Sequence, residues 1–274
     1  MQKNVLITGA STGIGFAAVK MLQENNFTAI ATVRKVADEN NLLKTYPGVK
    51  ILRLDVTDLE EIESLPEKLA QIGVHSLFGV INNAGVALAG PFLHQPFEEV
   101  QQTMQINVVA VMKICQILTP IIQPGGRIIN ISSIAGKTAT PFLAVYAASK
   151  HAIEGFSDAL RKELMLNDIK VIVVGPGTIS TPIWQKGFDI IKEKYSHTPF
   201  GHSFEIFMKI AMAEVKHAMP VEGVSADLLK ALTAKNPKLR YAPIPRKFRN
   251  WYLPRLIPAR LFDLLTVKVL KLKK

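Results

Sequence analysis

Short apolar runs alternate with longer amphipathic segments along the first two-thirds of the chain. Six of the runs have the length of buried strands, and they cover residues 5–8, 28–33, 49–54, 77–81, 127–132 and 169–174. Apolar residues at helical spacing fill three segments between them, at residues 15–25, 97–118 and 145–166. Because strands alternate with helices, the pattern predicts an α/β fold, a right-handed, doubly wound parallel sheet with helices on both faces.

The pattern changes toward the C-terminus, where five prolines fall within residues 237–258. From Ala259 onward, one face of a helix would carry Leu261, Phe262, Leu265, Val269 and Leu272, and the opposite face would carry Arg260, Lys268, Lys271 and Lys274. We therefore expect a single domain over residues 1–239 and an extension over residues 240–274 that ends in an amphipathic helix.

The positive charge of the chain is concentrated in this extension. The formal net charge is +11, and residues 240–274 hold ten Lys or Arg and one acid. A basic amphipathic helix with nearby aromatic residues suits an anionic membrane surface. The alternative is that the apolar face packs on the domain or on another subunit. No nucleic-acid recognition motif accompanies the charge, so we do not expect nucleic acid as a partner.

Other features of the sequence bear on the cellular compartment of the protein. The single cysteine, Cys115, excludes an intrachain disulfide and fits a reducing compartment. The first apolar run begins at Val5, which leaves no room for a signal peptide, and no apolar run extends over eighteen residues without interruption. We expect a cytoplasmic protein without a metal site, and contact with a membrane only through the C-terminal helix.

A glycine-rich turn joins the first strand to the first helix. The sequence NVLITGASTGIG covers residues 4–15, with glycines at 9, 13 and 15. Glycine permits a tight turn and close approach of the backbone, and a helix N-terminus offers N–H groups to a phosphate. Arg34 and Lys35 follow the second strand, where a base accommodates the 2′-phosphate of NADP. This position favours NADP(H) over NAD(H), with Ser11 as a second phosphate contact.

The stretch from Ser133 to Lys150 is the strongest candidate for catalysis. Tyr146 and Lys150 are four residues apart, so they lie one turn apart on the same face of a helix. An ammonium beside a phenol favours the phenolate, and we expect the pKa of Tyr146 to be lowered toward neutrality. Ser133 follows a strand, at the edge where parallel sheets bind ligands. Asn107 lies inside an apolar helical segment, where it needs polar partners.

Several short motifs occur together in a characteristic order. They are TGASTGIG at residues 8–15, Asp55-Val56, NNAG at residues 82–85, Asn107, Ser133, YAASK at residues 146–150, and Pro176-Gly177 with Thr181. Taken together, they resemble the compact single-domain branch of the short-chain dehydrogenase/reductase family, which has a Rossmann-like fold. The segment VYAASKHAIEG at residues 145–155 and the long extension are most similar to hydroxysteroid and retinol dehydrogenases.

The resemblance implies a role for each matching residue. Catalysis would involve Tyr146 as the acid/base, Lys150 as its partner, Ser133 to polarise the substrate oxygen, and Asn107 to seat a water that relays protons. Thr181 would bond the nicotinamide carboxamide, and Asp55 would bond the adenine. The full set expected to bind the cofactor is Gly9, Ser11, Gly13, Ile14, Gly15, Arg34, Asp55, Val56, Asn83, Gly85, Tyr146, Lys150, Pro176, Gly177 and Thr181.

These roles imply an NADP(H)-dependent enzyme that interconverts an alcohol and its ketone or aldehyde. Residues 183–220 carry Trp184, Phe188, Tyr195, Phe200, Phe204 and Phe207. In the family this segment forms a lid, and an apolar lid suits a steroid-, retinoid- or lipid-like substrate. A packing or dimer helix explains these aromatics nearly as well.

The alternatives are a nucleotide-sensing or scaffold protein without turnover and an enzyme like the sugar-nucleotide epimerases. The four intact catalytic residues argue against the first, and the short chain after residue 182 argues against the second. Broad apolar faces at residues 97–118 and 145–166 predict a homodimer or homotetramer.

Overall fold

A seven-stranded parallel sheet forms the centre of the protein. The computed structural model describes residues 3–180 and 193–272, and the strand order is β3-β2-β1-β4-β5-β6-β7. The strands are β1 (Lys3–Ile7), β2 (Phe27–Val33), β3 (Lys50–Arg53), β4 (Leu77–Asn82), β5 (Ile122–Ile131), β6 (Lys170–Val174) and β7 (Arg240–Tyr241). Val5 of β1 lies opposite Ala29 on one side and Gly79 on the other, so the strand order reverses direction at β1.

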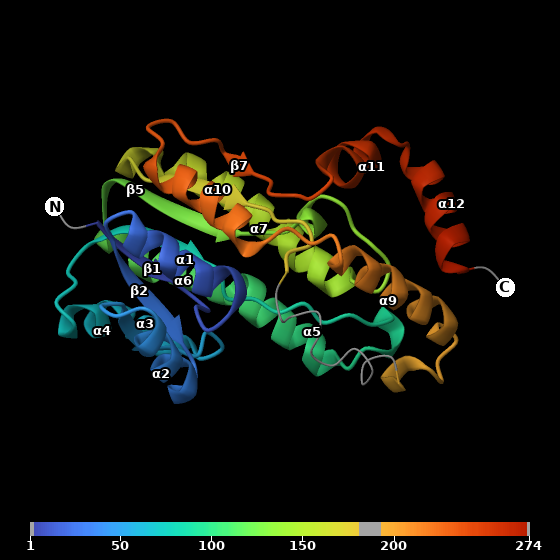
Figure 1. The fold of residues 1–274 in the computed structure, drawn as a ribbon, viewed down its shortest axis with the longest axis horizontal. Helices are drawn as coiled ribbons and strands as arrows, with labels where there is room; N and C mark the ends of the chain where they lie inside the picture. The colour runs from blue at the N-terminus through green and yellow to red at the C-terminus, as the bar shows by residue number, and fades with distance from the viewer. Residues whose placement is uncertain (1–2, 181–192, 273–274) are drawn as a thin grey trace.

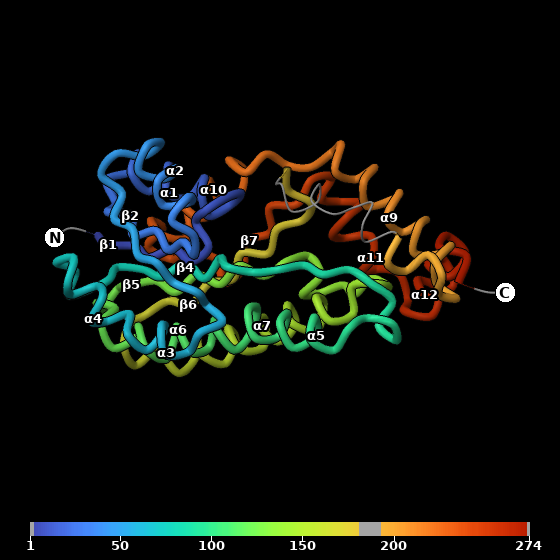
Figure 2. The backbone as a smooth tube through the Cα atoms, turned by 90° about the horizontal axis from the view of Figure 1, so that it is seen from below, coloured from blue at the N-terminus to red at the C-terminus, as the bar shows by residue number. Residues whose placement is uncertain are grey.

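Helices cover both faces of the sheet, as Figures 1 and 2 show. One layer consists of α1 (Gly13–Glu24), α2 (Val36–Thr45) and α10 (Val221–Thr233). The other consists of α3 (Leu59–Glu63), α4 (Leu65–Gln71), α5 (Phe97–Met104), α6 (Ala110–Leu118) and α7 (Ala144–Glu163). The doubly wound fold predicted from the sequence is confirmed, and so are its six strands and three helices.

Strands β2, β4 and β6 bury almost every residue on both of their faces, which explains why they read as continuous apolar runs. In β1, Val5 and Ile7 pack in the core beneath α1 and α10, whereas Leu6 packs in the core beneath α4 and α6. A parallel sheet covered on both sides has no solvent-facing strand positions to fill with polar residues.

The longest apolar helix of the described chain belongs to the second layer. Residues Phe97–Ile121 run without a break through α5, a π-helical turn η2 (Gln105–Val109), α6 and a 3-10 turn η3 (Thr119–Ile121). Length and composition alone would let this helix cross a membrane. Its apolar face instead packs against the sheet through Ile114 and Leu118, which are both buried. Its composition is therefore that of a core helix.

The C-terminal part of the chain lies beyond the carboxyl ends of the strands. It comprises α9 (Gly201–Val215), the π-helical turn η7 (Phe248–Tyr252), α11 (Leu253–Leu256) and α12 (Ala259–Leu270). A third apolar cluster joins α9 to the end of α12 and contains Phe142, Tyr195, Phe204, Phe207, Met208 and Leu270. The C-terminal helix predicted from Ala259 is confirmed, and Leu270 anchors it.

The sequence pattern did not predict β7, because two residues are too few to show an alternation. Arg240 and Tyr241 pair with Val173 and Val174 of β6 and complete the sheet. The predicted boundary after residue 239 therefore falls immediately before the last strand, and the extension begins inside the sheet.

Leu118 provides a test of the packing of the second helix layer. Leu118→Ala should lower the free energy of unfolding by about 3 kcal/mol, because it leaves a cavity in a fully buried site. Leu166→Ala is the matched control, because that side chain is 95% exposed, and its effect should stay within about 0.5 kcal/mol. Urea unfolding measures both, and equal losses would contradict this assignment of the core.

Candidate active site

A cleft opens at the carboxyl edge of the sheet, where β1 lies between β2 and β4. Its volume is about 480 Å³, and its wall combines residues at or just after the ends of β1 to β6 with the N-terminal parts of α1 and α7. In doubly wound sheets, ligands bind at this point of strand-order reversal. Most of the residues expected from the sequence line it, namely Gly9, Ser11, Gly13, Ile14, Arg34, Asp55, Val56, Asn83, Gly85, Ser133, Tyr146, Lys150, Pro176 and Gly177.

Two of the expected residues that the structure describes do not line this wall, and they are Gly15 and Asn107. Thr181, Trp184 and Phe188 lie outside the described residues. Gly15 and Asn107 lie behind the lining, where they support it. Sequence reasoning missed other lining residues, including Thr12, Val86, Ala87, Ile106 and Ile179. Thr12 lies within the glycine motif, and the other four have apolar side chains, which no motif distinguishes from ordinary core positions.

The glycine turn brings the backbone close to the cleft. Gly9 and Gly13 have φ angles of +65° and +59°, a region that side chains disfavour. A Cβ at position 9 would lie 2.8 Å from the Cα of Ala84, and one at position 15 would lie 2.6 Å from Nδ2 of Asn83. The turn leads into the N-terminus of α1, whose first N–H groups have no partners within the helix. This cradle fits the pyrophosphate of a dinucleotide.

Asn83 holds the glycine turn against the loop after β4. Its Nδ2 donates to the carbonyl oxygens of Thr8 and Gly9, each at 2.9 Å. In return, the Thr8 hydroxyl accepts from the backbone N–H groups of Asn83 and Ala84, each at 3.0 Å. The side chains of Thr8, which follows β1, and Asn83, which follows β4, therefore hold this part of the cleft wall together.

Charged residues lie at the outer end of the cleft. Arg34 Nη1 is 3.8 Å from Oδ2 of Asp55, and Lys35 lines the wall beside Arg34. Burial raises the pKa of Asp55, but hydrogen bonds from Thr57 and the charge of Arg34 outweigh it, and the pKa falls below its ordinary value. Asp55 is thus a carboxylate at neutral pH. The Arg34 side chain is 60% exposed, so an anionic group of a ligand can reach it from the solvent side.

The catalytic candidates come together at the inner end of the cleft. Ser133 follows β5, and its Oγ accepts from the N–H of Ala135 at 3.1 Å. Tyr146 and Lys150 project from the start of α7, with Lys150 Nζ 5.8 Å from the centroid of the Tyr146 ring. Nζ also donates to the carbonyl oxygen of Ile131 at 2.9 Å. The sequence spacing therefore places hydroxyl, phenol and ammonium in one pocket.

The pKa of Tyr146 is raised in the structure, whereas the sequence predicted that it would be lowered. Burial raises it above 10, and a hydrogen bond with Ser133 lowers it only in part. Burial also lowers the pKa of Lys150 to about 8, against the opposing charge of Glu154. Burial is the largest cause of both shifts, so desolvation dominates over attraction between the two side chains. The phenol is protonated at neutral pH, as a proton donor must be.

Asn107 supports the site from a π-helical turn, a feature frequent at functional sites. Its Oδ1 accepts from Val86 N at 2.9 Å, and its Nδ2 donates to Val86 O at 2.9 Å and to Ser149 Oγ at 3.0 Å. These bonds join the loop after β4 to α7. The expected seating of a relay water by Asn107 remains a prediction.

The aromatic residues of the expected lid pack with one another. Tyr195, Phe204 and Phe207 are buried in the third apolar cluster, with Phe142 at its centre. This arrangement accords with the alternative of a packing helix for this part of the segment. Residues 183–192 lie outside the described residues.

A dinucleotide cradle beside a serine, a tyrosine and a lysine defines a class of oxidoreductase. A family model described as short chain dehydrogenase matches residues 3–190. The chain belongs to this family, the short-chain dehydrogenases/reductases, which confirms the resemblance drawn from its motifs.

Individual relatives match over nearly the whole chain. An NADPH-dependent 3-dehydrocapnine reductase of Ornithobacterium rhinotracheale is 35% identical, over 97% of this chain and 96% of its own. A 17-beta-hydroxysteroid dehydrogenase type 6 of Bos taurus is 30% identical, over 88% and 80% respectively. The crystal structure of a short-chain dehydrogenase from Streptomyces avermitilis has a TM-score of 0.76 at 26% identity, over 98% and 97%.

Arg34 provides a test of cofactor choice. Arg34→Ala should weaken NADPH binding about tenfold and leave NADH binding nearly unchanged, because only NADPH carries the 2′-phosphate. Arg53→Ala is the matched control, since this exposed arginine at the end of β3 pairs with Glu39 outside the cleft. Fluorescence titration measures both affinities. Equal losses for the two cofactors would contradict the role of Arg34.

Proposed function

We propose that this protein is an NADP(H)-dependent oxidoreductase that interconverts an alcohol and its ketone or aldehyde on a hydrophobic small molecule. The observation that carries the proposal is the convergence of Ser133, Tyr146 and Lys150 at the inner end of a cleft that the glycine cradle also lines. When bound, NADPH supplies the hydride that reduces a carbonyl carbon.

The residues of the chain supply position and a proton. The Ser133 hydroxyl would donate to the substrate carbonyl oxygen and hold it beside Tyr146. As the carbonyl carbon is reduced, Tyr146 would transfer its phenolic proton to that oxygen, which becomes the alcohol. The Lys150 ammonium would stabilise the phenolate left behind until solvent returns a proton. In the direction of oxidation, the same groups act in reverse order.

NADP(H) is the cofactor that the outer end of the cleft favours. Arg34 and Lys35 follow β2, where the ribose 2′-substituent lies in this class of fold. Their positive charge suits a phosphate, and the relative from O. rhinotracheale is NADPH-dependent by name.

A hydrophobic substrate suits the apolar part of the cleft wall. Val86, Ala87, Ile106 and Ile179 line the cleft and offer a ligand few polar partners. Relatives whose names refer to a hydroxysteroid and to 3-dehydrocapnine support a carbonyl on a lipid-like molecule.

Substrate screening with Tyr146→Phe tests the activity. The wild type should oxidise NADPH with some member of a panel of steroid, retinoid and long-chain ketones and aldehydes, measured by absorbance. Tyr146→Phe should lower kcat at least about 100-fold, because it removes the transferable proton, and should leave NADPH affinity near wild type. Tyr46→Phe is the control, since it removes a phenol that packs on Phe16 away from the cleft. Wild-type turnover by Tyr146→Phe would overturn the assignment.

Assembly into a homodimer or homotetramer forms part of the proposal. Phe97, Val109 and Met112 expose apolar surface along the helix of α5 and α6. Such a surface on a long helix suits pairing around a twofold axis.

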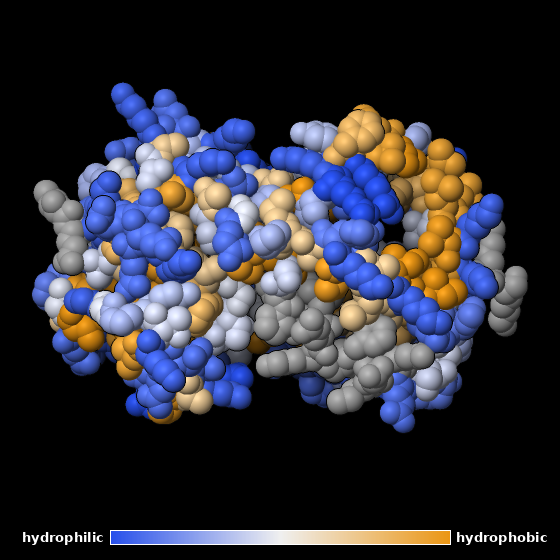
Figure 3. Space-filling model, viewed as in Figure 1, coloured by the Kyte–Doolittle hydropathy of each residue, from blue (hydrophilic) through white to orange (hydrophobic). Residues whose placement is uncertain are grey.

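We also propose that the C-terminal extension contacts an anionic lipid surface. Figure 3 shows apolar side chains gathered over α11 and α12 with basic side chains beside them. Leu256, Leu261, Leu264, Leu265 and Val269 are exposed there, and Leu270 is buried against α9. The helix therefore uses one edge for packing and leaves another free. Arg260 and Lys268 are exposed as well, and each is four residues from the exposed Leu264, so positive charge lies beside this apolar side chain.

Vesicle sedimentation tests this surface. The wild type should sediment with phosphatidylserine-containing vesicles at low salt and bind phosphatidylcholine vesicles less, because each base near an anionic surface contributes about 1 kcal/mol. Leu264→Gln/Leu265→Gln should reduce binding and preserve NADPH affinity, whereas the control Leu166→Gln alters an exposed leucine after α7. Loss of the oligomer in light scattering, without loss of vesicle binding, would show that the exposed edge is a subunit interface.

A further inference from the structure

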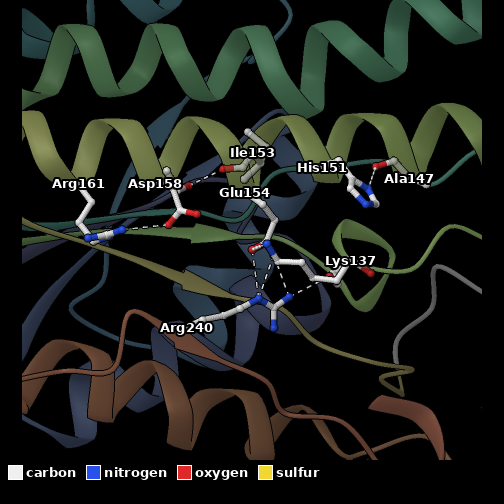
Figure 4. A network of polar contacts seen from close by, with 10 residues as sticks. Lys137, Ala147, His151, Ile153, Glu154, Asp158, Arg161 and Arg240 are labelled. Atoms are coloured by element: carbon white, nitrogen blue, oxygen red, sulfur yellow. Dashed lines mark hydrogen bonds and ion pairs between the residues drawn. The ribbon is translucent and has the colours of Figure 1, made fainter. Parts of the chain in front are cut away.

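A buried ion pair lies directly behind the catalytic residues. Arg240 of β7 and Glu154 of α7 form a two-pronged contact, with Nη2 to Oε1 at 2.8 Å and Nε to both carboxylate oxygens at 3.1 and 3.2 Å (Figure 4). Glu154 is only 5% exposed. A planar guanidinium matches a carboxylate in this geometry, and such bonds are stronger than neutral ones.

Arg240 also bonds the backbone of a catalytic residue. Its Nη2 donates to the carbonyl oxygen of Ser133 at 3.2 Å. The guanidinium lies against Gly175, just after β6, and a Cβ at that position would come within 2.6 Å of Cζ of Arg240. Glycine at 175 thus makes room for the arginine. One side chain therefore joins the end of β5, the end of β6 and α7.

Glu154 acts on the other catalytic partner. It follows Lys150 by four residues on α7, so the two lie on the same face of the helix. The Glu154 carboxylate opposes the effect of burial on the Lys150 ammonium and raises its pKa. The other charged groups that face Glu154 are Lys137, 3.3 Å from Oε2, Arg240 and, further off, Arg255.

We propose that Arg240 and Glu154 are positioning residues of the reaction: Arg240 holds Ser133 through its carbonyl oxygen, and Glu154 keeps Lys150 positively charged. The inference rests on the proposed reductase function. The C-terminal extension would also support the site through Trp251. The centroid of the Trp251 ring lies 4.5 Å from Cζ of Arg240 and 3.3 Å from Cζ of Arg255. Trp251 is buried and packs the arginine in place.

Glu154 and Arg240 carry opposite charges, so removing one or the other should shift the titration of Lys150 in opposite directions, which makes the proposal testable. Glu154→Gln removes an attractive charge and leaves Arg240 unopposed, so the Lys150 ammonium should be lost at lower pH. Arg240→Gln removes a repulsive charge and should retain the ammonium to higher pH. The alkaline limb of the kcat profile, expected near the Lys150 pKa of about 8, should shift by about one pH unit downward in the first and upward in the second.

Two further variants separate charge from geometry. Arg240→Lys keeps the charge and loses the fork, so kcat should fall about tenfold while the alkaline limb stays near its wild-type position. Glu154→Gln/Arg240→Gln removes both members of the buried ion pair, so neither is left unpaired and the double variant should fold even if a single variant does not. Its alkaline limb should lie between those of the two single variants. Asp158→Asn is the control, because it removes a largely exposed carboxylate one turn further along α7 that pairs with Arg161 (Figure 4).

The experiment has a readout that needs no substrate. The pH dependence of NADPH affinity, measured by fluorescence, should shift to lower pH in Glu154→Gln and to higher pH in Arg240→Gln. The reason is that the Lys150 ammonium is expected to hold the nicotinamide ribose. If the wild type reduced no carbonyl, the proposed function would fail, and opposite shifts in NADPH binding would still support the charge balance. Identical pH profiles for the wild type and both single variants would overturn the inference.

Discussion

The site depends on one constraint, which is that parallel strands all end at the same edge of the sheet. The side chains that follow β1, β4 and β5 must therefore meet there, however far apart they lie in the chain. The hydrogen bonds of Asn83 with Thr8 and Gly9 join the loop after β4 to the turn after β1 and so fix one wall of the cleft. The glycine turn, Ser133 and the start of α7 all take their places relative to that wall.

Burial sets the electrostatics of the inner cleft. Desolvation acts on Tyr146 and Lys150 in opposite directions, raising the pKa of the phenol and lowering that of the ammonium. Both shifts favour neutral forms, so the site needs a compensating anion to keep Lys150 charged. Glu154 is that anion, and Arg240 and Lys137 limit its own cost of burial.

The C-terminal extension is joined to this chemistry by its first residues. β7 completes the sheet with Arg240, and Trp251 then packs against the same arginine. Farther along, Leu270 of α12 packs against α9, and other leucines of the helix remain exposed. The extension thus has an inner part that supports the site and an outer surface, which we propose meets lipid.

The sequence by itself determined what depends on local spacing. Apolar runs predicted six strands, the glycines predicted the phosphate turn, and a separation of four residues put Tyr146 and Lys150 on one helical face, because backbone geometry repeats over short distances. Only the tertiary structure decided the two-residue strand β7, the partners of Asn107, the direction of the Tyr146 pKa and the pairing of Glu154 with Arg240, 86 residues away. Burial and long-range charge contacts arise from packing between elements, and no local pattern in the chain records which elements meet.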